Sequence, residues 1–562
     1  MMSDKKTKNI DNKDVIEFLA TSNSWINNGL ITLVQRLQTD FKSQANIEFN
    51  HDKIKISSIG NQKLDELISN ALNITAAEGT HNISASIKLL NQQFNSGYSF
   101  KTYPTSKEDF NEKIEITDEE KNFLKKQNKE NTKELKIWKQ RLSFLSDNQN
   151  YLKKGLNLKD DTKFIKAIFE EGNKKICPAC GSKTGKLDDI QQQFNPLTSE
   201  HHNNKIEGFD FGSMGRKNFQ ICPKCILLCY FSTFNKNIPF FQESPKVTYL
   251  AIPNSVDLEI LRKVNHNLSH PAQMIDLSKP TSFYYSSNIK SLFHRSKYAC
   301  LLTLLHNIKN EYSKQEPDSL VMSFEEIPKE DFLEVIEWLF ISKSFRINHI
   351  RADEKIYDIL EKYKDPQNND DVYLIPDFLN NFIFSEFDTN IIGQFFEGIL
   401  KLESKKVSDG LFHMAKVSAG TPSKISQKSR PNGSSPLFLF EKVFLPKIME
   451  VKTLLSNELS NACRDLAKSI GRGFSGDVGM MTKFAYASGT REFKMALEDA
   501  IFRLAKKSAL DKNESNYVSE DNLKIIFDSL NAEQFSDIKN NFVSFMSVAA
   551  ISRNYQNNKG GI

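Results

Sequence analysis

The sequence predicts an α+β protein, with mixed N-terminal and middle domains, an inserted zinc-ribbon segment with four cysteines, and a C-terminal helical bundle. Three observations predict this class. Short runs in the first half alternate apolar and polar residues, which is typical of strands. Two Cys-Pro-x-Cys pairs lie in the same half. The last part of the chain instead repeats apolar residues at spacings of three and four, which is typical of helices.

The chain of 562 residues is too long for a single core, so several domains are expected. Hydrophobic residues make up 39% of it and include 42 phenylalanines, which excludes wholesale disorder. The net charge of +5 is small and does not by itself indicate a nucleic acid partner. The polar start has no apolar run of a secretory signal, and the seven cysteines fit a reducing compartment, so a cytoplasmic location without membrane contact is expected.

The N-terminal recognition domain, residues 1–171, is predicted to mix helices and strands. Ser24 is placed to cap a helix whose apolar residues recur at helical spacing. The runs Ile47–Phe49 and Ile54–Ile56 alternate around a polar turn, which predicts a hairpin. A capping box at Thr117 predicts the start of a long charged helical stretch.

The middle domain, residues 235–409, is also predicted to be mixed, with a strand at Lys246–Ile252 and a helix at Phe332–Ile341. Residues 410–435 contain no acidic side chain and are rich in Gly, Pro and Ser, which predicts a basic linker. Residues 436–562 are predicted to form the helical bundle. Its apolar repeats run through Phe444–Leu459, Phe493–Leu504 and Phe535–Phe545.

Residues 172–234 form the predicted zinc-binding segment. Each Cys-Pro-x-Cys turn places two sulfurs on one side of a tight knuckle, and two knuckles complete a tetrahedron of thiolates that suits Zn²⁺. Such a site leaves no open position, so the zinc is expected to be structural. Four buried or redox-active cysteines are the alternative. The predicted ligands are Cys177, Cys180, Cys222 and Cys225, whereas Cys229, Cys300 and Cys463 are expected to be ordinary buried residues.

A second interpretation comes from the residues between the two cysteine pairs, where Glu200, His201, His202 and Asn218 lie. Some HNH nucleases place metal-binding His and Asn residues between such pairs. That family usually has a further Asn or His just after the second pair, whereas this chain continues into the apolar run Ile226–Leu228. An HNH-like nuclease is therefore an alternative function, and a polar surface loop is the other explanation.

Positive charge gathers in the acid-free linker and in the terminal bundle. In the bundle, the glycine-rich run 471–476 predicts a hinge between helices, with a phosphate cradle as the alternative. Flexible cations among Ser, Gly and Thr suit phosphate binding without base readout, although a simple solvated linker would have the same composition. Together the two regions predict a surface that follows a sugar-phosphate backbone, such as a displaced single strand. The candidate nucleic-acid-binding residues are Lys416, Lys424, Lys428 and Arg430 in the linker, and Arg472, Lys483 and Arg491 in the bundle, with Arg464, Lys468 and Lys494 nearby.

The segment FLATSNSWINNGL, Phe18–Leu30, is similar to a segment of the large subunits of type I-B CRISPR Cascade complexes. Those subunits often carry two CPxC pairs in their first half and end in a helical bundle. The chain therefore resembles that family in its layout as well as in these motifs. It carries no HExxH, GxSxG, paired-carboxylate or dinucleotide motif, and no enzymatic activity is expected.

The resemblance implies a non-catalytic large subunit that contacts crRNA, target double-stranded DNA and its displaced strand, other Cascade subunits and a separate helicase-nuclease. Its N-terminal domain would inspect the short motif beside the target, while base pairing with the guide reads the rest. Its terminal bundle would steady the displaced strand. A zinc-ribbon scaffold protein of another assembly is a further alternative.

Overall fold

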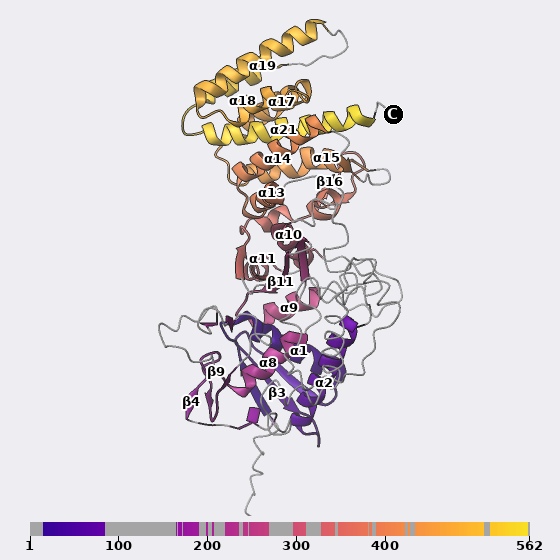
Figure 1. The fold of residues 1–562 in the computed structure, drawn as a ribbon, viewed down its shortest axis with the longest axis vertical. Helices are drawn as coiled ribbons and strands as arrows, with labels where there is room; N and C mark the ends of the chain where they lie inside the picture. The colour runs from indigo at the N-terminus through magenta and orange to yellow at the C-terminus, as the bar shows by residue number, and fades with distance from the viewer. Residues whose placement is uncertain are drawn as a thin grey trace, which may run out of the picture. The chain divides into compact units, whose positions relative to one another are not determined.

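The computed structural model groups the chain by its contacts into two compact units (Figure 1). The first comprises residues 1–287, 312–323 and 337–350, and the second comprises 288–311, 324–336 and 351–562. The finer division into five segments stays a prediction. The structure describes residues 15–84, 165, 167–170, 172, 174–189, 198–199, 205–206, 220–234, 240–244, 247–268, 296–310, 328–342, 347–379, 382–384, 389–421, 425–427, 433–510 and 518–559.

A three-stranded antiparallel sheet opens the first unit, with β3 between β1 and β2. Ile16 faces Ile56 and Phe18 faces Ile54 across the β1–β3 pair, and all four side chains are buried. One face of the sheet is therefore apolar, as alternation along the strands requires. The predicted hairpin is confirmed. The strands are β1 (Val15–Leu19), β2 (Ala45–Phe49) and β3 (Lys53–Ser58).

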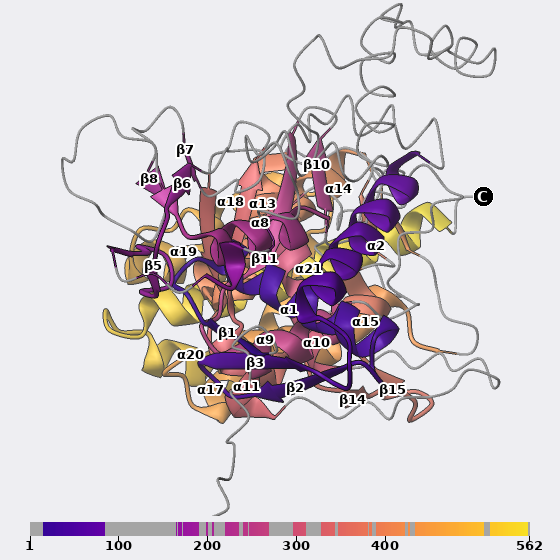
Figure 2. The same ribbon diagram turned by 90° about the horizontal axis from the view of Figure 1, so that it is seen from below.

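Helix α1 (Ser24–Asp40) is largely buried, and its residues Trp25, Ile26 and Leu30 are fully buried. The helix begins one residue earlier than predicted, because the side chain of Asn23, rather than Ser24, accepts the capping hydrogen bond from the Ile26 amide. Figure 2 shows α1 beside two further helices, which also contact each other. These are α2 (Leu64–Ser84) and α8 (Pro223–Phe234).

A second antiparallel sheet in this unit has the strand order β10-β11-β12-β13. The predicted strand at Lys246–Ile252 is confirmed as β11. The predicted helix Phe332–Ile341 is wrong beyond its first turn, because its four consecutive apolar residues 338–341 form a strand paired with β11. The elements here are β10 (Phe240–Ser244), β11 (Val247–Pro253), α9 (Leu258–Leu268), β12 (Glu337–Ser342) and β13 (Ile347–Arg351). Helix α11 (Lys329–Glu334), which comes just before β12 in the chain, belongs to the second unit.

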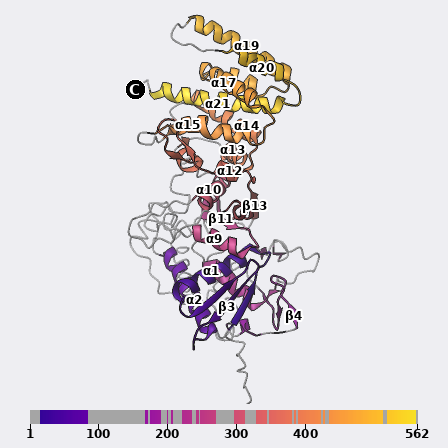
Figure 3. The same ribbon diagram turned by 180° about the vertical axis from the view of Figure 1, so that it is seen from behind.

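The second unit is mainly helical, with two-stranded sheets β14–β15 and β16–β17. Its last helix, α21, packs against α14 and α17, and Figure 3 shows these three helices side by side. The Phe542 ring lies 5.0 Å from that of Phe484 and 5.3 Å from that of Phe493, which makes an aromatic centre for the bundle. The helices are α10 (Lys297–Lys309), α12 (Ile356–Ile359), η6 (Leu374–Leu379), α13 (Thr389–Lys401), α14 (Ser404–Gly420), α15 (Pro436–Leu439), η8 (Phe440–Phe444), α16 (Leu445–Glu450), α17 (Asn457–Gly473), α18 (Val478–Ala485), α19 (Thr490–Leu510), α20 (Glu520–Ser529) and α21 (Phe535–Lys559), and the strands are β14 (Tyr363–Lys364), β15 (Asp371–Val372), β16 (Phe382–Phe384) and β17 (Ile425–Gln427).

The terminal helices at Phe493–Leu504 and Phe535–Phe545 are confirmed as parts of α19 and α21. The run Phe444–Leu459 is instead divided, because the side chain of Ser456 accepts a hydrogen bond from the Leu459 amide and starts a new helix. The prediction of a hinge over residues 471–476 is wrong for its first three residues, because α17 continues through Gly473. Among the described residues, no helix is both long enough and apolar enough to span a membrane.

The predicted linker 410–435 is wrong over its first part, where α14 continues to Gly420. Leu411, Met414 and Ala415 recur at helical spacing and are buried, so packing outweighs a composition that resembles a loop. Residues 425–427 form β17, paired with β16. The charged helical stretch predicted to begin at Thr117 lies outside the described residues.

Candidate metal centre

The sulfurs of Cys177, Cys180, Cys222 and Cys225 all lie within 4.8 Å of one another. The Cys177 and Cys225 sulfurs are 3.9 Å apart, and the Cys180 and Cys222 sulfurs are 3.7 Å apart. A tetrahedral zinc with bonds of about 2.3 Å would hold its sulfurs about 3.8 Å apart. The four side chains therefore have the separation that a closed tetrahedral metal site needs.

The first pair occupies a tight turn between two short paired strands. The Cys177 amide donates to the Ser182 carbonyl at 2.9 Å, and the Gly181 amide donates back to the Cys177 carbonyl at 2.9 Å. Gly181 has φ +69°, in the left-handed region that favours glycine, which lets the chain turn directly after Cys180. This is the knuckle that the sequence predicts. Its strands are β4 (Lys175–Ile176) and β5 (Lys183–Thr184).

The second pair does not form a second knuckle. Cys222 directly precedes α8 and Cys225 lies in its first turn, where the Ile226 amide donates to the Cys222 carbonyl at 3.1 Å. Pro223 occupies the first helical position, which its missing amide hydrogen and fixed φ favour. The Cys222 amide also donates to the Cys177 sulfur at 3.3 Å, which joins the two pairs directly.

The centre is closed to solvent on most sides, since three of its cysteines are buried and only Cys180 is partly exposed. Hydrogen bonds from Cys177 and Cys222 hold the pKa of Cys180 far below its ordinary value. The neighbouring sulfurs of Cys177 and Cys180, together with burial, raise the pKa of Cys225 well above it. Four thiolates cannot share this space without a cation, so the donor set fits a divalent metal.

Helix α8 joins the centre to the core of the first unit. An added Cβ at Gly29 of α1 would lie 1.9 Å from the Leu228 carbonyl oxygen, so only glycine allows the two backbones to approach so closely. Ser232, one turn further along α8, donates its hydroxyl to the Trp25 carbonyl. The helix that begins at the second cysteine pair is therefore held against α1 at Leu228 and Ser232.

Polar side chains of α1 are committed to internal hydrogen bonds. The Asn27 amide group donates to the carbonyls of Thr21 at 2.7 Å and Ser255 at 3.1 Å, and its oxygen accepts from the Thr21 amide at 2.8 Å. Asn28 donates to the Pro253 carbonyl at 3.3 Å. These buried residues tie the segment Phe18–Leu30 to the end of β11 and to the loop that follows it, and they act as structural groups.

The candidate nucleic-acid-binding residues are not brought together into one described patch. Lys416 is exposed on α14 and Arg491 is exposed near the start of α19. Lys424, Lys428 and Arg430 lie outside the described residues, as do Glu200, His201, His202 and Asn218 of the nuclease interpretation.

The remaining bundle candidates have carboxylate neighbours in the structure. Lys483 Nζ lies 2.6 Å from an Asp499 oxygen, and Arg472 lies 3.9 Å from Glu441. Lys468, which the sequence groups with the surface cations, is buried and lies 3.2 Å from Glu441. Burial lowers the pKa of Lys468 to about 8 although Glu441 opposes the shift.

Cys229, Cys300 and Cys463 are buried, as expected, and do not belong to the cluster of four cysteines. Comparison of the chain with protein-family models and with curated proteins finds no match.

Proposed function

We propose that the chain is the large, non-catalytic subunit of a type I CRISPR Cascade complex. It would contact crRNA and target DNA, recognise the motif beside the target, and help recruit a separate helicase-nuclease. One observation carries this proposal. The segment Phe18–Leu30 and the two CPxC pairs, which are the motif-like parts of the resemblance, belong to one core through the contact between α1 and α8.

We further propose that the metal is a structural Zn²⁺ ion. A set of four thiolates favours zinc among the common metals, and the absence of an open ligand position argues against catalysis at this ion. The ion would fix the start of α8, which has mostly apolar side chains and three buried residues in the run Ile226–Leu228. Its role would be to hold the surface that reads DNA in place.

The proposal is tested by expressing the chain with its neighbouring genes and purifying it through an affinity tag. We expect small RNA and repeated backbone subunits to co-purify, and we expect DNA affinity that falls steeply with salt. A Cys222→Ser variant should lose zinc and assemble poorly, whereas Cys463→Ser, a change at a buried cysteine of the second unit, should retain zinc. If the purified chain contains zinc but neither co-purifies with RNA nor binds DNA, the result would instead support a scaffold protein of another assembly.

The nuclease alternative is tested separately with the same preparation. Nicking of a DNA duplex that depends on an added divalent metal, and that a His201→Ala, His202→Ala double variant abolishes, would contradict the non-catalytic assignment. We expect neither variant nor wild type to cut DNA without the helicase-nuclease.

A further inference from the structure

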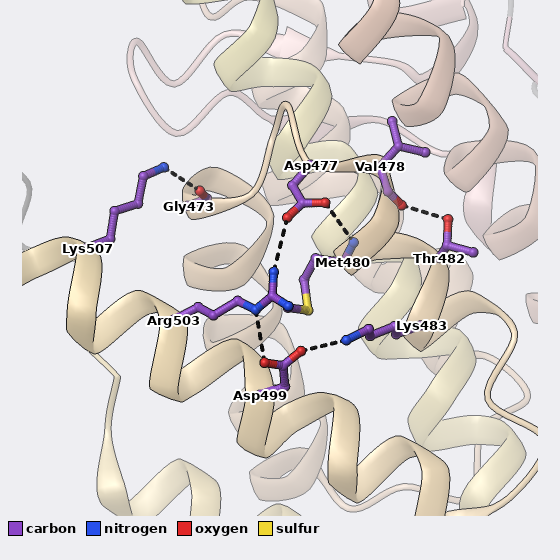
Figure 4. Close-up of polar contacts among 9 residues, drawn as sticks. All are labelled: Gly473, Asp477, Val478, Met480, Thr482, Lys483, Asp499, Arg503 and Lys507. Carbon is purple, nitrogen blue, oxygen red and sulfur yellow. Dashed lines mark hydrogen bonds and ion pairs between the residues drawn. The ribbon is translucent and has the colours of Figure 1, made fainter.

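One carboxylate on the second unit holds two cations that come from different helices. The Asp499 side chain on α19 accepts from Lys483 Nζ on α18 at 2.6 Å and, through its other oxygen, from Arg503 Nε at 2.9 Å (Figure 4). Arg503 also lies 3.8 Å from Asp477, whose side chain accepts from the Met480 amide and caps α18. The two cations therefore have a defined separation before any ligand arrives.

This arrangement is solvent-exposed, and its internal ion pairs are weak. The side chains of Lys483, Arg503 and Asp499 are 50%, 48% and 30% exposed. Lys483 lowers the pKa of Asp499, so the carboxylate is ionised at neutral pH. Exposed pairs of this kind contribute little because water and salt screen them. A competing anion with further contacts elsewhere can replace the carboxylate.

We propose that Lys483 and Arg503 form a binding site for a backbone phosphate of single-stranded nucleic acid, and that Asp499 occupies this site in the free chain. This inference rests on the proposed function and adds a means by which the chain regulates its own binding to nucleic acid. A phosphodiester offers two unesterified oxygens, as the carboxylate does, so each cation can exchange one oxygen for another. Asp499 then acts as an internal competitor that weakens non-specific binding.

The class of ligand follows from the apolar side chains on the same helix. Phe502 precedes Arg503 and is 71% exposed, and Met495 is 58% exposed. Phe502 lies three residues after Asp499, about 60° around the helix, so an aromatic face adjoins the cation pair. Exposed aromatic side chains beside cations stack unpaired bases, which duplex DNA does not present. The surface therefore fits a single strand better than a duplex.

The test measures binding of fluorescein-labelled oligothymidylate and of a matched duplex to the full chain by fluorescence anisotropy. Asp499→Asn removes the competitor, and we expect about two- to fivefold tighter binding to the single strand. Glu498→Gln is the matched control, because it changes the charge of the neighbouring exposed residue by the same amount without altering the Lys483–Asp499–Arg503 contacts. Adding Lys483→Ala to Asp499→Asn should cancel the gain.

Phe502→Ala separates the stacking contact from charge. It should weaken single-strand binding at least about fivefold and change duplex binding less. Leu454→Ala, at a residue that is 72% exposed, is its control and should change neither.

The outcomes separate this inference from the proposed function. If wild type binds the single strand but Asp499→Asn binds no tighter than Glu498→Gln, the internal competitor is wrong while the proposed function stands. If neither wild type nor Asp499→Asn binds nucleic acid and no RNA co-purifies, both are overturned. Binding by Asp499→Asn alone would support the competitor directly.

Discussion

Replacing Gly29 by alanine should destabilise the first unit, although helix propensity alone predicts the opposite. Gly29 lies inside α1, where an alanine ordinarily stabilises a helix by about 1 kcal/mol relative to glycine. In this structure the added methyl group would lie 1.9 Å from the Leu228 carbonyl oxygen and 2.9 Å from the Ser232 hydroxyl. The substitution therefore brings two effects of opposite sign into competition.

The cost of the steric overlap should exceed the gain in helix propensity. Ordinary contact begins at 3.4 Å, so α1 and α8 would have to separate by about 1.5 Å at their crossing. The obstacle is backbone, which cannot rotate away as the end of a side chain can. Overpacking a core costs about 1 to 3 kcal/mol, and a backbone contact belongs at the upper end. After subtracting the gain in propensity, we expect a net loss of roughly 2 kcal/mol.

Urea unfolding followed by tryptophan fluorescence measures this loss, because the described tryptophans, Trp25 and Trp338, are buried in the first unit. Trp25 is fully buried in α1 and reports the crossing directly. The control is Gly393→Ala in α13, where an added Cβ meets nothing within 4 Å. That variant should be stabilised by roughly 0.5 to 1 kcal/mol, measured by circular dichroism. A Gly29→Ala protein as stable as wild type would refute the close approach of α1 and α8.

Four other predictions concern the cysteine cluster, the buried Lys468 and the exposed Arg491. Cys177→Ser, or removal of the metal by a chelator, should make the first unit sensitive to protease and leave the second folded; an unchanged digestion pattern would contradict a structural metal. Lys468→Met should destabilise the second unit by about 3 kcal/mol in chemical denaturation, because Glu441 stays buried without its main partner. The Lys468→Met, Glu441→Met double variant leaves no unpaired charge and should have nearly the stability of the wild type. The pKa of Lys468 is about 8 in the folded chain and 10.5 in the unfolded chain, so the unfolded chain binds more protons between these two pH values. This lysine should therefore make the free energy of unfolding rise with pH between pH 8 and 10.5. The double variant should lack that rise. Arg491→Gln should weaken binding to all DNA sequences about equally, and a loss confined to one sequence would mean that Arg491 reads bases.

Periodicity in the sequence predicted the elements that are defined by residues close together in the chain. The hairpin of β2 and β3 and the helices α19 and α21 have clear periodicity, and the structure has them as expected. The run Trp338–Ile341 is apolar at every position, so periodicity cannot distinguish a buried strand from a helix. Its pairing with β11, far away in the sequence, decides the outcome. Long-range partners of this kind are not visible in a single sequence.

The clustering of Cys177, Cys180, Cys222 and Cys225 could be predicted, because two Cys-Pro-x-Cys pairs have the spacing of a metal site. The helix that follows Cys222 was missed, although Pro223 before a long apolar run was a usable signal for a helix start. The partners of the bundle cations could not be predicted. Lys468 meets Glu441 from a different helix and Lys483 meets Asp499 from another, so composition alone made both appear as available positive charge.

The proposed metal and the glycine at the crossing of α1 and α8 should not act independently on stability. Helix α8 has few polar side chains to fix its position, so the cysteines at its start and the contact with Gly29 each restrict how it lies on α1. If Cys177→Ser loosens that start, α8 can shift and relieve the overlap that Gly29→Ala creates. The double variant should therefore lose less stability than the sum of the two single losses, by an interaction energy of roughly 0.5 kcal/mol or more. Strict additivity would mean that the metal does not position α8, and that its role lies in the Cys177–Cys180 knuckle alone.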